Sequence, residues 1–351
     1  MFNTYEYFDE LNKRNVKIRF DAGQPDLSPN KEILEALIGS LDKMGYGSAR
    51  GLDELCEEIA QLHGVKREQV VITPGSKFAV AALIHNTKCV SLIAPYWPGY
   101  KGTADLLGVG IDVSKSYMED GWLPRVWTPK GDSIILNYPN NPTGTIPSRE
   151  FTDKVIEEAE VNGRLIISDE VYRDIAFGER RFSILDYMPK RFALIHSCSK
   201  TFSMPGLRLG YVVGDVETVK KVVKFIRATI TTLPIFSQRA AVKAIRILEK
   251  EKDRITKVYK QRVQYACENL DSSLFKFKRP DGGFYMWLKL PNINGTEFAY
   301  KLMEKDVGIF PGEAFGEEYV DYLRMSLVCD GELLERGIRT VNETARNWGS
   351  N

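Results

Sequence analysis

Short apolar runs alternate with amphipathic stretches between residues 45 and 235. Five runs bounded by Gly, Pro or Asp are typical of buried strands: residues 69–73, 89–94, 133–137, 165–168 and 193–197. Residues 148–162 have helical periodicity, with Ser148 at the N-cap position and Gly163 just beyond the end. This alternation predicts an α/β fold with a large, mostly parallel (mixed) sheet that is flanked by helices.

The pattern changes after residue 236. Residues 237–269 predict one long charged helix, and 275–290 predict two strands joined by a turn at Asp281-Gly282-Gly283. A helix (296–305), a strand (322–327) and a last helix (332–347) follow, which is typical of a smaller α+β domain. We therefore expect a large domain at 44–236 and a small domain built from 1–43 and 237–351.

Composition and charge exclude several classes of protein. Of 351 residues, 48 are Lys or Arg and 47 are Asp or Glu, so the net charge is +1. This balance disfavours a nucleic-acid partner or a membrane surface. No run is apolar enough to span a membrane, and the first 20 residues lack a signal-peptide core, so we expect a cytoplasmic protein.

Cysteine and histidine spacing predicts no metal site. The five cysteines contain no CxxC pair, and the three histidines lie far apart in the sequence. We expect free thiols in a reducing compartment, at Cys56, Cys89, Cys198, Cys267 and Cys329.

Polar groups follow each predicted strand, where α/β sheets bind their ligands. Gly75-Ser76-Lys77 would begin a helix and offer backbone N–H groups to an anion such as phosphate. In the segment 95–100, Trp97 could stack on a planar ring, whereas core packing is the favoured interpretation for Tyr96 and Tyr100.

The later strand ends carry an amide, a carboxylate, a phenol and two cations: Asn141, Asp169, Tyr172, Lys200 and Arg208. A lysine directly after a buried strand is unusual and is often retained for its chemistry. The set fits pyridoxal 5′-phosphate (PLP), with a Schiff base on Lys200 and Asp169 on the pyridine nitrogen.

Five motifs in matching order carry a family resemblance: TPGSK (73–77), PYWPGY (95–100), NNPTG (140–144), SDEVY (168–172) and SCSKTFSMPGLRLG (197–210). The chain resembles the fold type I PLP-dependent aminotransferases of class I/II, and most closely the aspartate/aromatic aminotransferase-like members. The resemblance runs from residues 21–26 to residues 322–326.

The resemblance implies roles around the cofactor. Lys200 would hold PLP and move the proton between substrate and cofactor, and Asp169 would keep the pyridine nitrogen protonated. Asn141 and Tyr172 would bind the ring oxygen, and Trp97 would stack on the ring. The phosphate would be bound by Gly75, Ser76, Lys77, Ser197 and Arg208.

The resemblance also implies how substrate is bound. Arg324 would clamp the substrate α-carboxylate, with the Gly23 backbone, Asn141 and Trp97 nearby. Tyr46 would reach the phosphate of a partner subunit, which implies a homodimer with shared active sites. Arg227 and Lys101 are candidates for a second substrate carboxylate, although a solvated surface charge is the favoured interpretation for both.

The expected activity is a ping-pong exchange of an amino group between an L-amino acid and a 2-oxo acid, of the aspartate/glutamate or aromatic type. A histidinol-phosphate-type aminotransferase is an alternative because the chain is short. A PLP lyase or decarboxylase would use the same cofactor residues, so the motifs leave that reaction open as well. The preferred donor and acceptor are not determined by these motifs.

Overall fold

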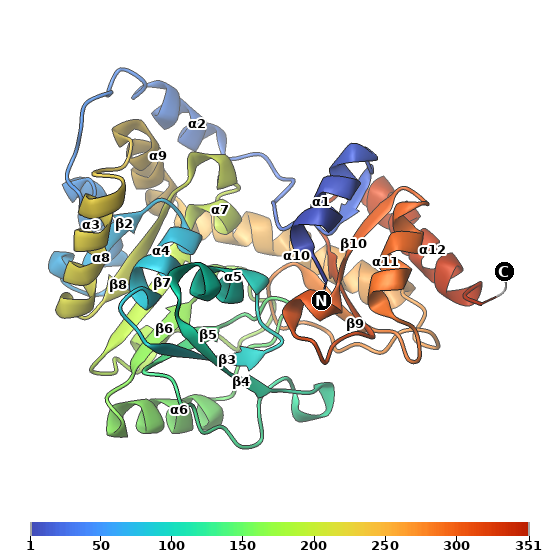
Figure 1. Ribbon diagram of the computed structural model, residues 1–351. Coiled ribbons are helices and arrows are strands. Elements are labelled where there is room, and N and C mark those ends of the chain that lie inside the picture. Colours follow the sequence, from blue (N-terminus) through green and yellow to red (C-terminus); the bar gives the residue numbers. More distant parts are fainter. Residues whose placement is uncertain (1, 350–351) are drawn as a thin grey trace.

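The larger sheet has seven strands in the order β2-β8-β7-β6-β5-β3-β4 (Figure 1). The computed structural model describes residues 2–349. Neighbouring strands pair in parallel from β4 to β7, whereas β8 is antiparallel to both β7 and β2. The strands are β2 (Val70–Thr73), β3 (Cys89–Ala94), β4 (Gly110–Lys115), β5 (Ser133–Asn137), β6 (Leu165–Asp169), β7 (Phe192–Ser197) and β8 (Gly210–Gly214).

The five predicted strands of this sheet are confirmed, and their bounds differ by at most one residue. Four of them, β2, β5, β6 and β7, are buried at every position, because neighbouring strands and covering helices exclude water from both faces. The prediction missed β4, whose side chains are mostly half-buried or exposed, and β8, a five-residue strand bounded by glycines. Neither forms the long apolar run that marked the others.

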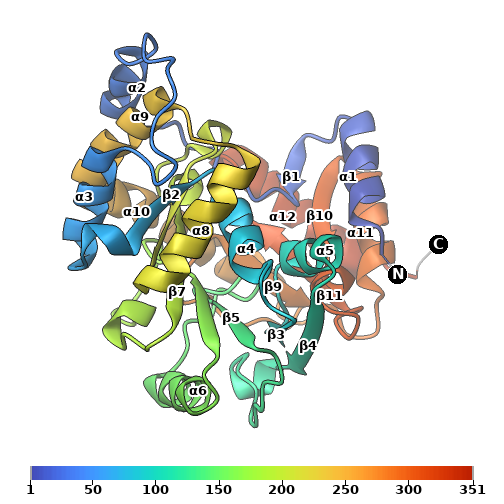
Figure 2. The ribbon, with the colours of Figure 1, turned by 60° about the vertical axis from the view of Figure 1, so that its left-hand side comes forward.

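Helices connect and cover these strands. Helix α4 packs against both α5 and α8, and α4 and α8 contact β7 and β8 (Figure 2). The helix expected at 148–162 is confirmed as α6, with the Ser148 hydroxyl accepting the Phe151 N–H. The helices of this part are α3 (Asp53–His63), α4 (Ser76–Ile84), α5 (Pro98–Leu107), α6 (Arg149–Val161), α7 (Cys198–Thr201) and α8 (Val216–Thr229).

A second sheet of four strands lies beside the first, in the order β1-β10-β11-β9 (Figure 1). It brings the N-terminal strand β1 into parallel pairing with β10, which lies almost 290 residues later in the chain. Its elements are α1 (Thr4–Lys13), β1 (Ile18–Phe20), β9 (Tyr285–Lys289), α11 (Gly295–Met303), β10 (Val307–Pro311), β11 (Tyr322–Ser326) and α12 (Gly331–Arg346).

Two expectations for the C-terminal half were wrong in detail. Residues 237–269 form two helices, α9 (Ile235–Arg246) and α10 (Leu248–Asn269), because the backbone of Ile247 leaves the helical region. No Gly or Pro marks that break in the sequence. Residues 275–290 contain one strand, β9, instead of the two that were expected. Where the first was expected, Lys276 forms only an isolated β-bridge with Lys289.

The hydrophobic cores indicate how the chain is divided. Ile33 of α2 (Lys31–Ile38) and the buried face of α9 belong to the core around the larger sheet. Helix α10 contributes Leu248 to that core and Val263 to the core of the second sheet. We therefore propose that α2 and α9 belong to the larger domain, with α10 as the connection.

Two features are absent from residues 2–349. No described helix combines the length and apolar character needed to cross a bilayer. No group of three or more His, Cys, Asp or Glu side chains in that range is placed to hold a metal ion.

Candidate active site

A cavity of about 910 Å³ lies between the two sheets. One wall is formed by the carboxyl ends of the strands of the larger sheet, and the other by α1, the segment after β1, and the second sheet. Nine of the predicted site residues line the cavity: Gly23, Ser76, Lys77, Trp97, Asn141, Asp169, Tyr172, Lys200 and Arg324.

Lys200 lies in the short helix α7, directly after β7. Its Nζ donates a hydrogen bond to the backbone oxygen of Gly23 at 2.5 Å. Desolvation, with the nearby charge of Arg324, lowers the pKa of Lys200 to about 8. The amine can therefore lose its proton close to neutral pH, as a nucleophile or base requires.

Asp169 ends β6 and is buried. Its Oδ2 accepts a 2.6 Å hydrogen bond from the Tyr100 hydroxyl, and its Oδ1 accepts the Val171 N–H. Burial raises the pKa of Asp169, and the bond from Tyr100 opposes that shift. The interpretation of Tyr100 as core packing was therefore incomplete: its ring is buried, but its hydroxyl holds the carboxylate that faces the cavity.

Tyr172 follows Asp169 by three residues and is joined to a residue that the motifs did not reveal. Its hydroxyl lies 2.8 Å from the hydroxyl of Tyr285, on β9, and both rings are buried. Tyr285 also lines the cavity. The sequence signal for Tyr285 was weak, since a tyrosine in an apolar strand is normally a core residue.

Arg324 is 5% exposed on β11, and none of the described carboxylates forms an ion pair with it. It donates from Nη2 to the backbone oxygen of Asp21 at 2.6 Å and from Nη1 to Asn141 Oδ1 at 3.1 Å. Its guanidinium lies 4.3 Å from the ring centre of Tyr285, and its buried Nε has no partner among the described residues. A buried cation held by neutral groups is suited to bind a carboxylate from a ligand.

The junction of β2 and α4 has a geometry suited to an anion. Gly75 has a φ of +88°, and a Cβ there would lie 3.0 Å from Nη2 of Arg208. The absence of a side chain therefore lets the guanidinium approach the N-terminus of α4, where backbone N–H groups are free. Ser197 ends β7, and its hydroxyl accepts the Ser199 N–H. Gly75, Ser197 and Arg208 do not line the cavity itself.

Comparison with known proteins agrees with this arrangement. The sequence profile of the aminotransferase class I and II family matches residues 15–341. The aspartate aminotransferase of Thermococcus kodakarensis is 38% identical over 98% of this chain and 93% of its own length. The chain belongs to the class I and II aminotransferase family.

Other members of this aminotransferase family show the same likeness. The (5-formylfuran-3-yl)methyl phosphate transaminase of Methanocaldococcus jannaschii is 30% identical over 93% of this chain and 90% of its own. The crystal structure of the Thermotoga maritima aspartate aminotransferase superposes with a TM-score of 0.92, at 27% identity, covering 99% of this chain and 97% of that one. The expected fold and the expected aminotransferase function are confirmed.

Three further residues considered from the aminotransferase resemblance lie outside the cavity or are already paired. Tyr46 is 89% exposed and does not line the cavity of its own chain. Arg227 is exposed on α8 and also lies outside the cavity. Lys101 lines the cavity, but its amine is paired with Asp105 at 2.7 Å.

Proposed function

We propose that this aminotransferase uses PLP to exchange an amino group between L-aspartate and a 2-oxo acid by a ping-pong mechanism. The observation that carries the proposal is the meeting of Lys200 and Arg324 in one cavity. A lysine with a lowered pKa and a buried arginine without an ionic partner are the two groups that an amino-acid substrate needs. The relatives named as aspartate aminotransferases support aspartate as the donor.

Three structural features fit PLP. The cradle at Gly75 and Arg208 suits its phosphate, and the buried Asp169 lacks a cationic partner among the described residues and suits a protonated ring nitrogen. Tyr172 and Asn141 lie on the same wall and would bind the ring oxygen. When bound, PLP would supply the electron sink that makes the substrate Cα–H acidic.

The protein's own groups would then divide the remaining work. Arg324 would orient the α-carboxylate through its planar guanidinium, and Asn141 would hold that guanidinium in place. Lys200 would accept the proton from the substrate Cα and donate it to the cofactor. The free amine lies in the cavity and donates a 2.5 Å hydrogen bond to the Gly23 oxygen, which supports this role.

The test of this function is an absorbance and product assay on the PLP-loaded protein. Adding L-aspartate should bleach the near-visible band of the bound cofactor and release oxaloacetate, and adding 2-oxoglutarate should restore the band. Net formation of pyruvate or ammonia from the amino acid, with no 2-oxo acid acceptor, would instead support a lyase.

For the second carboxylate of aspartate we propose Lys77. Of the cavity-lining cations besides Lys200 and Arg324, Lys101 is paired with Asp105 and Arg19 is paired with Asp21. Lys77 is exposed at the start of α4 and has no ion-pair partner among the described residues. The candidates Arg227 and Lys101 are less well placed for this role.

Lys77→Met should raise the KM for L-aspartate by about 1.4-fold to fivefold, because an exposed ion pair contributes about 0.2–1 kcal/mol. The KM for L-phenylalanine, which lacks the second carboxylate, should not change. Lys101→Met is the matched control in the same cavity. An equal loss for both substrates with Lys77→Met would reject the assignment.

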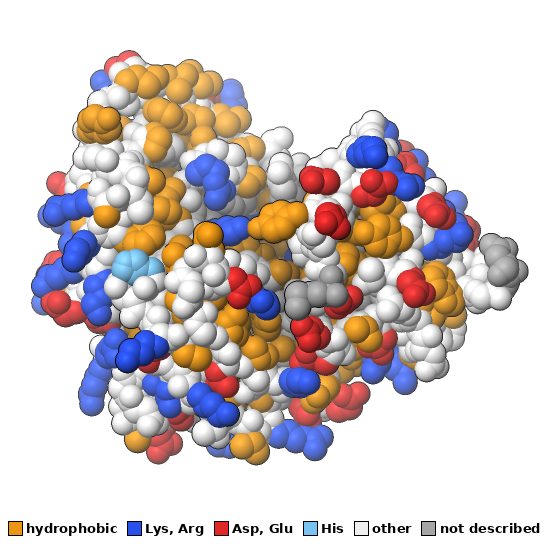
Figure 3. Space-filling model, viewed as in Figure 1, with side chains coloured by type: hydrophobic (Ala, Val, Ile, Leu, Met, Phe, Trp, Pro, Cys, Tyr) orange, Lys and Arg blue, Asp and Glu red, His pale blue; other side chains and the backbone are white. Residues whose placement is uncertain are grey.

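We propose that the active unit is a homodimer, in which Tyr46 contacts the phosphate site of the partner copy. Exposed apolar side chains gather over α2 and the following loop, at the top of Figure 3: Leu34, Ile38, Leu41, Met44 and Tyr46. Such a concentration of apolar surface favours burial against another protein. A cytoplasmic location is proposed as well, supported by five unpaired cysteines.

Light scattering tests the dimer. The wild-type protein should have twice the chain mass, and Met44→Asp with Ile38→Asp should give a monomer with weakened PLP binding. A monomeric wild-type protein with full activity would contradict the shared site.

A further inference from the structure

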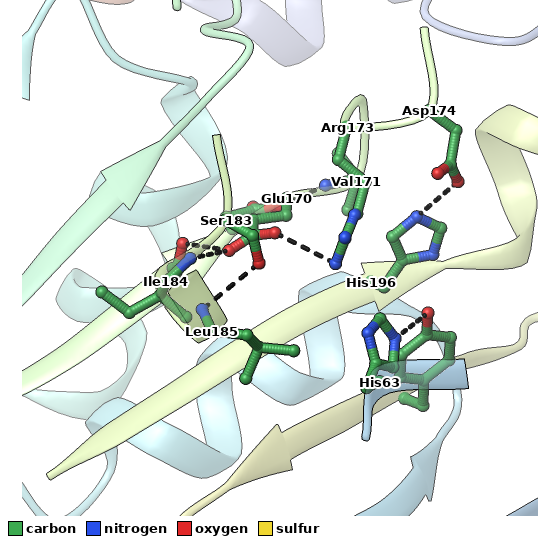
Figure 4. Close-up of polar contacts among 12 residues, drawn as sticks. His63, Glu170, Val171, Arg173, Asp174, Ser183, Ile184, Leu185 and His196 are labelled. Atoms are coloured by element: carbon green, nitrogen blue, oxygen red, sulfur yellow. Dashed lines mark hydrogen bonds and ion pairs between the residues drawn. The ribbon is translucent and has the colours of Figure 1, made fainter. Parts of the chain in front are cut away.

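Asp174 carries a largely enclosed carboxylate, with a side chain that is 10% exposed, and it has no role in the proposed chemistry. Asp174 lies in the loop after β6, five residues beyond Asp169. Its Oδ2 accepts hydrogen bonds from His196 Nε2 and from the Thr201 hydroxyl, each at 2.9 Å. Figure 4 shows the carboxylate facing the His196 ring, while the adjacent Arg173 turns toward Glu170.

The two donors stand on either side of Lys200 in the sequence. His196 is the next-to-last residue of β7, and Thr201 is the last residue of α7. Both are buried, at 2% and 0% exposure. One oxygen of the Asp174 carboxylate therefore bonds both to β7, which precedes Lys200, and to the residue directly after Lys200.

Asp174 is itself anchored from other directions. Its backbone oxygen accepts the hydroxyl of Thr256, on α10, at 2.8 Å. The His196 ring stacks on Tyr211 with centroids 5.2 Å apart, and the Tyr211 hydroxyl lies 3.0 Å from His63 Nε2. Helix α7, which carries Lys200, is thus connected through Asp174 and His196 to α10, β8 and α3.

Helix α7 needs such support because it is only four residues long. A helix of one turn has almost no internal hydrogen bonds, so its own backbone cannot fix the direction of a side chain. Ser197 caps its N-terminus, and the bond from Thr201 to Asp174 supports its C-terminal end. In the proposed function the Lys200 amine must reach several atoms one after another, so the backbone that carries it must be correctly placed. A displacement of about 1 Å can lower a rate roughly 100-fold.

We propose that Asp174 is a positioning residue, which fixes the backbone of Lys200 by holding His196 and Thr201 together. The inference rests on the proposed function of Lys200. A carboxylate suits this place, because it accepts both hydrogen bonds on one oxygen without needing a donor of its own. The largely enclosed charge is compensated by these bonds and by nearby Arg173, which together lower the pKa of Asp174 although burial alone would raise it.

The decisive pair of variants changes Thr201. Thr201→Val removes the hydroxyl and keeps the shape, whereas Thr201→Ser keeps the hydroxyl. In the PLP-loaded protein, Thr201→Val should lower kcat for L-aspartate about 10–100-fold with KM within about twofold. Thr201→Ser should retain a kcat near the wild-type value, and Asp174→Ala should show at least the loss of Thr201→Val.

Hydrogen exchange provides a readout that does not depend on activity. Thr201→Val and Asp174→Ala should raise amide exchange at residues 198–203 about tenfold, while the strands of the second sheet exchange as in the wild type. Glu251→Gln is the matched control, because Glu251 is a buried carboxylate on α10 that contacts Asn30 and Arg254 instead.

Two results would overturn the proposal. One is unchanged exchange at 198–203 together with unchanged kcat in Thr201→Val. The other is faster exchange throughout the molecule with a normal kcat per folded enzyme, which would make Asp174 a general stability residue. If Asp174→Ala does not fold, the Thr201 pair still decides. Wild-type turnover tests the proposed function separately.

Discussion

The two walls of the cavity hold their functional groups in different ways. On the sheet wall, four groups lie at or just after the end of a buried strand, so local sequence and strand register place them: Asn141, Asp169, Tyr172 and Lys200. On the opposite wall, Arg324 is held by the backbone oxygen of Asp21, and it lies against the ring of Tyr285. The groups of the first wall are brought together by their places at the strand ends, although their hydrogen-bond partners are distant in the chain. The second wall forms only through contacts between distant segments.

This difference indicates a division of labour. The sheet wall carries groups that would act on the cofactor and on protons, whereas the opposite wall carries the groups that would bind the substrate. The segment after β1 touches both, since the Asp21 oxygen accepts from Arg324 and the Gly23 oxygen accepts from Lys200. Changes on the two walls should therefore affect different kinetic constants.

The largest effect is expected on the sheet wall. Lys200→Ala should lower kcat at least about 100- to 10,000-fold, because a positioned acid–base group contributes that much. The fold should persist, as judged by an unchanged circular dichroism spectrum. Added methylamine should restore part of the rate. A variant with normal turnover would show that another group moves the proton.

Arg324→Ala, on the opposite wall, should mainly raise KM. The loss of a desolvated charge–carboxylate contact costs about 2–5 kcal/mol. Arg324→Lys should recover little, because an ammonium lacks the planar pair of donors. Steady-state kinetics with L-aspartate measures both. If kcat falls while KM stays constant, Arg324 belongs to the reaction step and the contrast between the walls fails.

The pH dependence of PLP incorporation connects the two walls. The pKa of Lys200 in the cofactor-free protein is lowered to about 8, so the fraction of free amine rises about tenfold per pH unit below 8 and levels off above it. Incorporation rates measured from about pH 6 to 10 should follow this curve. Since the Arg324 charge contributes to the shift, Arg324→Gln should move the plateau to higher pH; an identical curve would contradict that coupling.

The smallest effects are expected at Tyr285, which touches both walls. Tyr285→Phe removes only the hydroxyl bonded to Tyr172, worth about 0.5–1.5 kcal/mol, and should lower kcat slightly with KM unchanged. Tyr285→Leu also removes the ring beside Arg324 and should raise KM. Kinetics of the two variants separates these contacts. Identical kinetic constants for both would show that the ring adds nothing to substrate binding.

The sequence alone determined the sheet wall of this protein. Buried strands are apolar at nearly every position and end at Gly, Pro or polar residues, so the predicted bounds of β3 and β5 match the observed ones. Parallel strands place their carboxyl ends along one edge, so the order of the strands and motifs is enough to predict that Asn141, Asp169 and Lys200 meet. The break at Ile247 was missed because no local signal marks it.

Only the tertiary structure decided the opposite wall and the supports behind the sheet. The bond from Arg324 to the Asp21 oxygen joins residues 303 positions apart, and a backbone acceptor leaves no trace in residue identity. Tyr100, Tyr285 and Asp174 are ordinary core or loop residues by sequence, and their partners appear only when separate segments pack together. Local pattern specifies which elements form, whereas long-range packing specifies which polar groups meet.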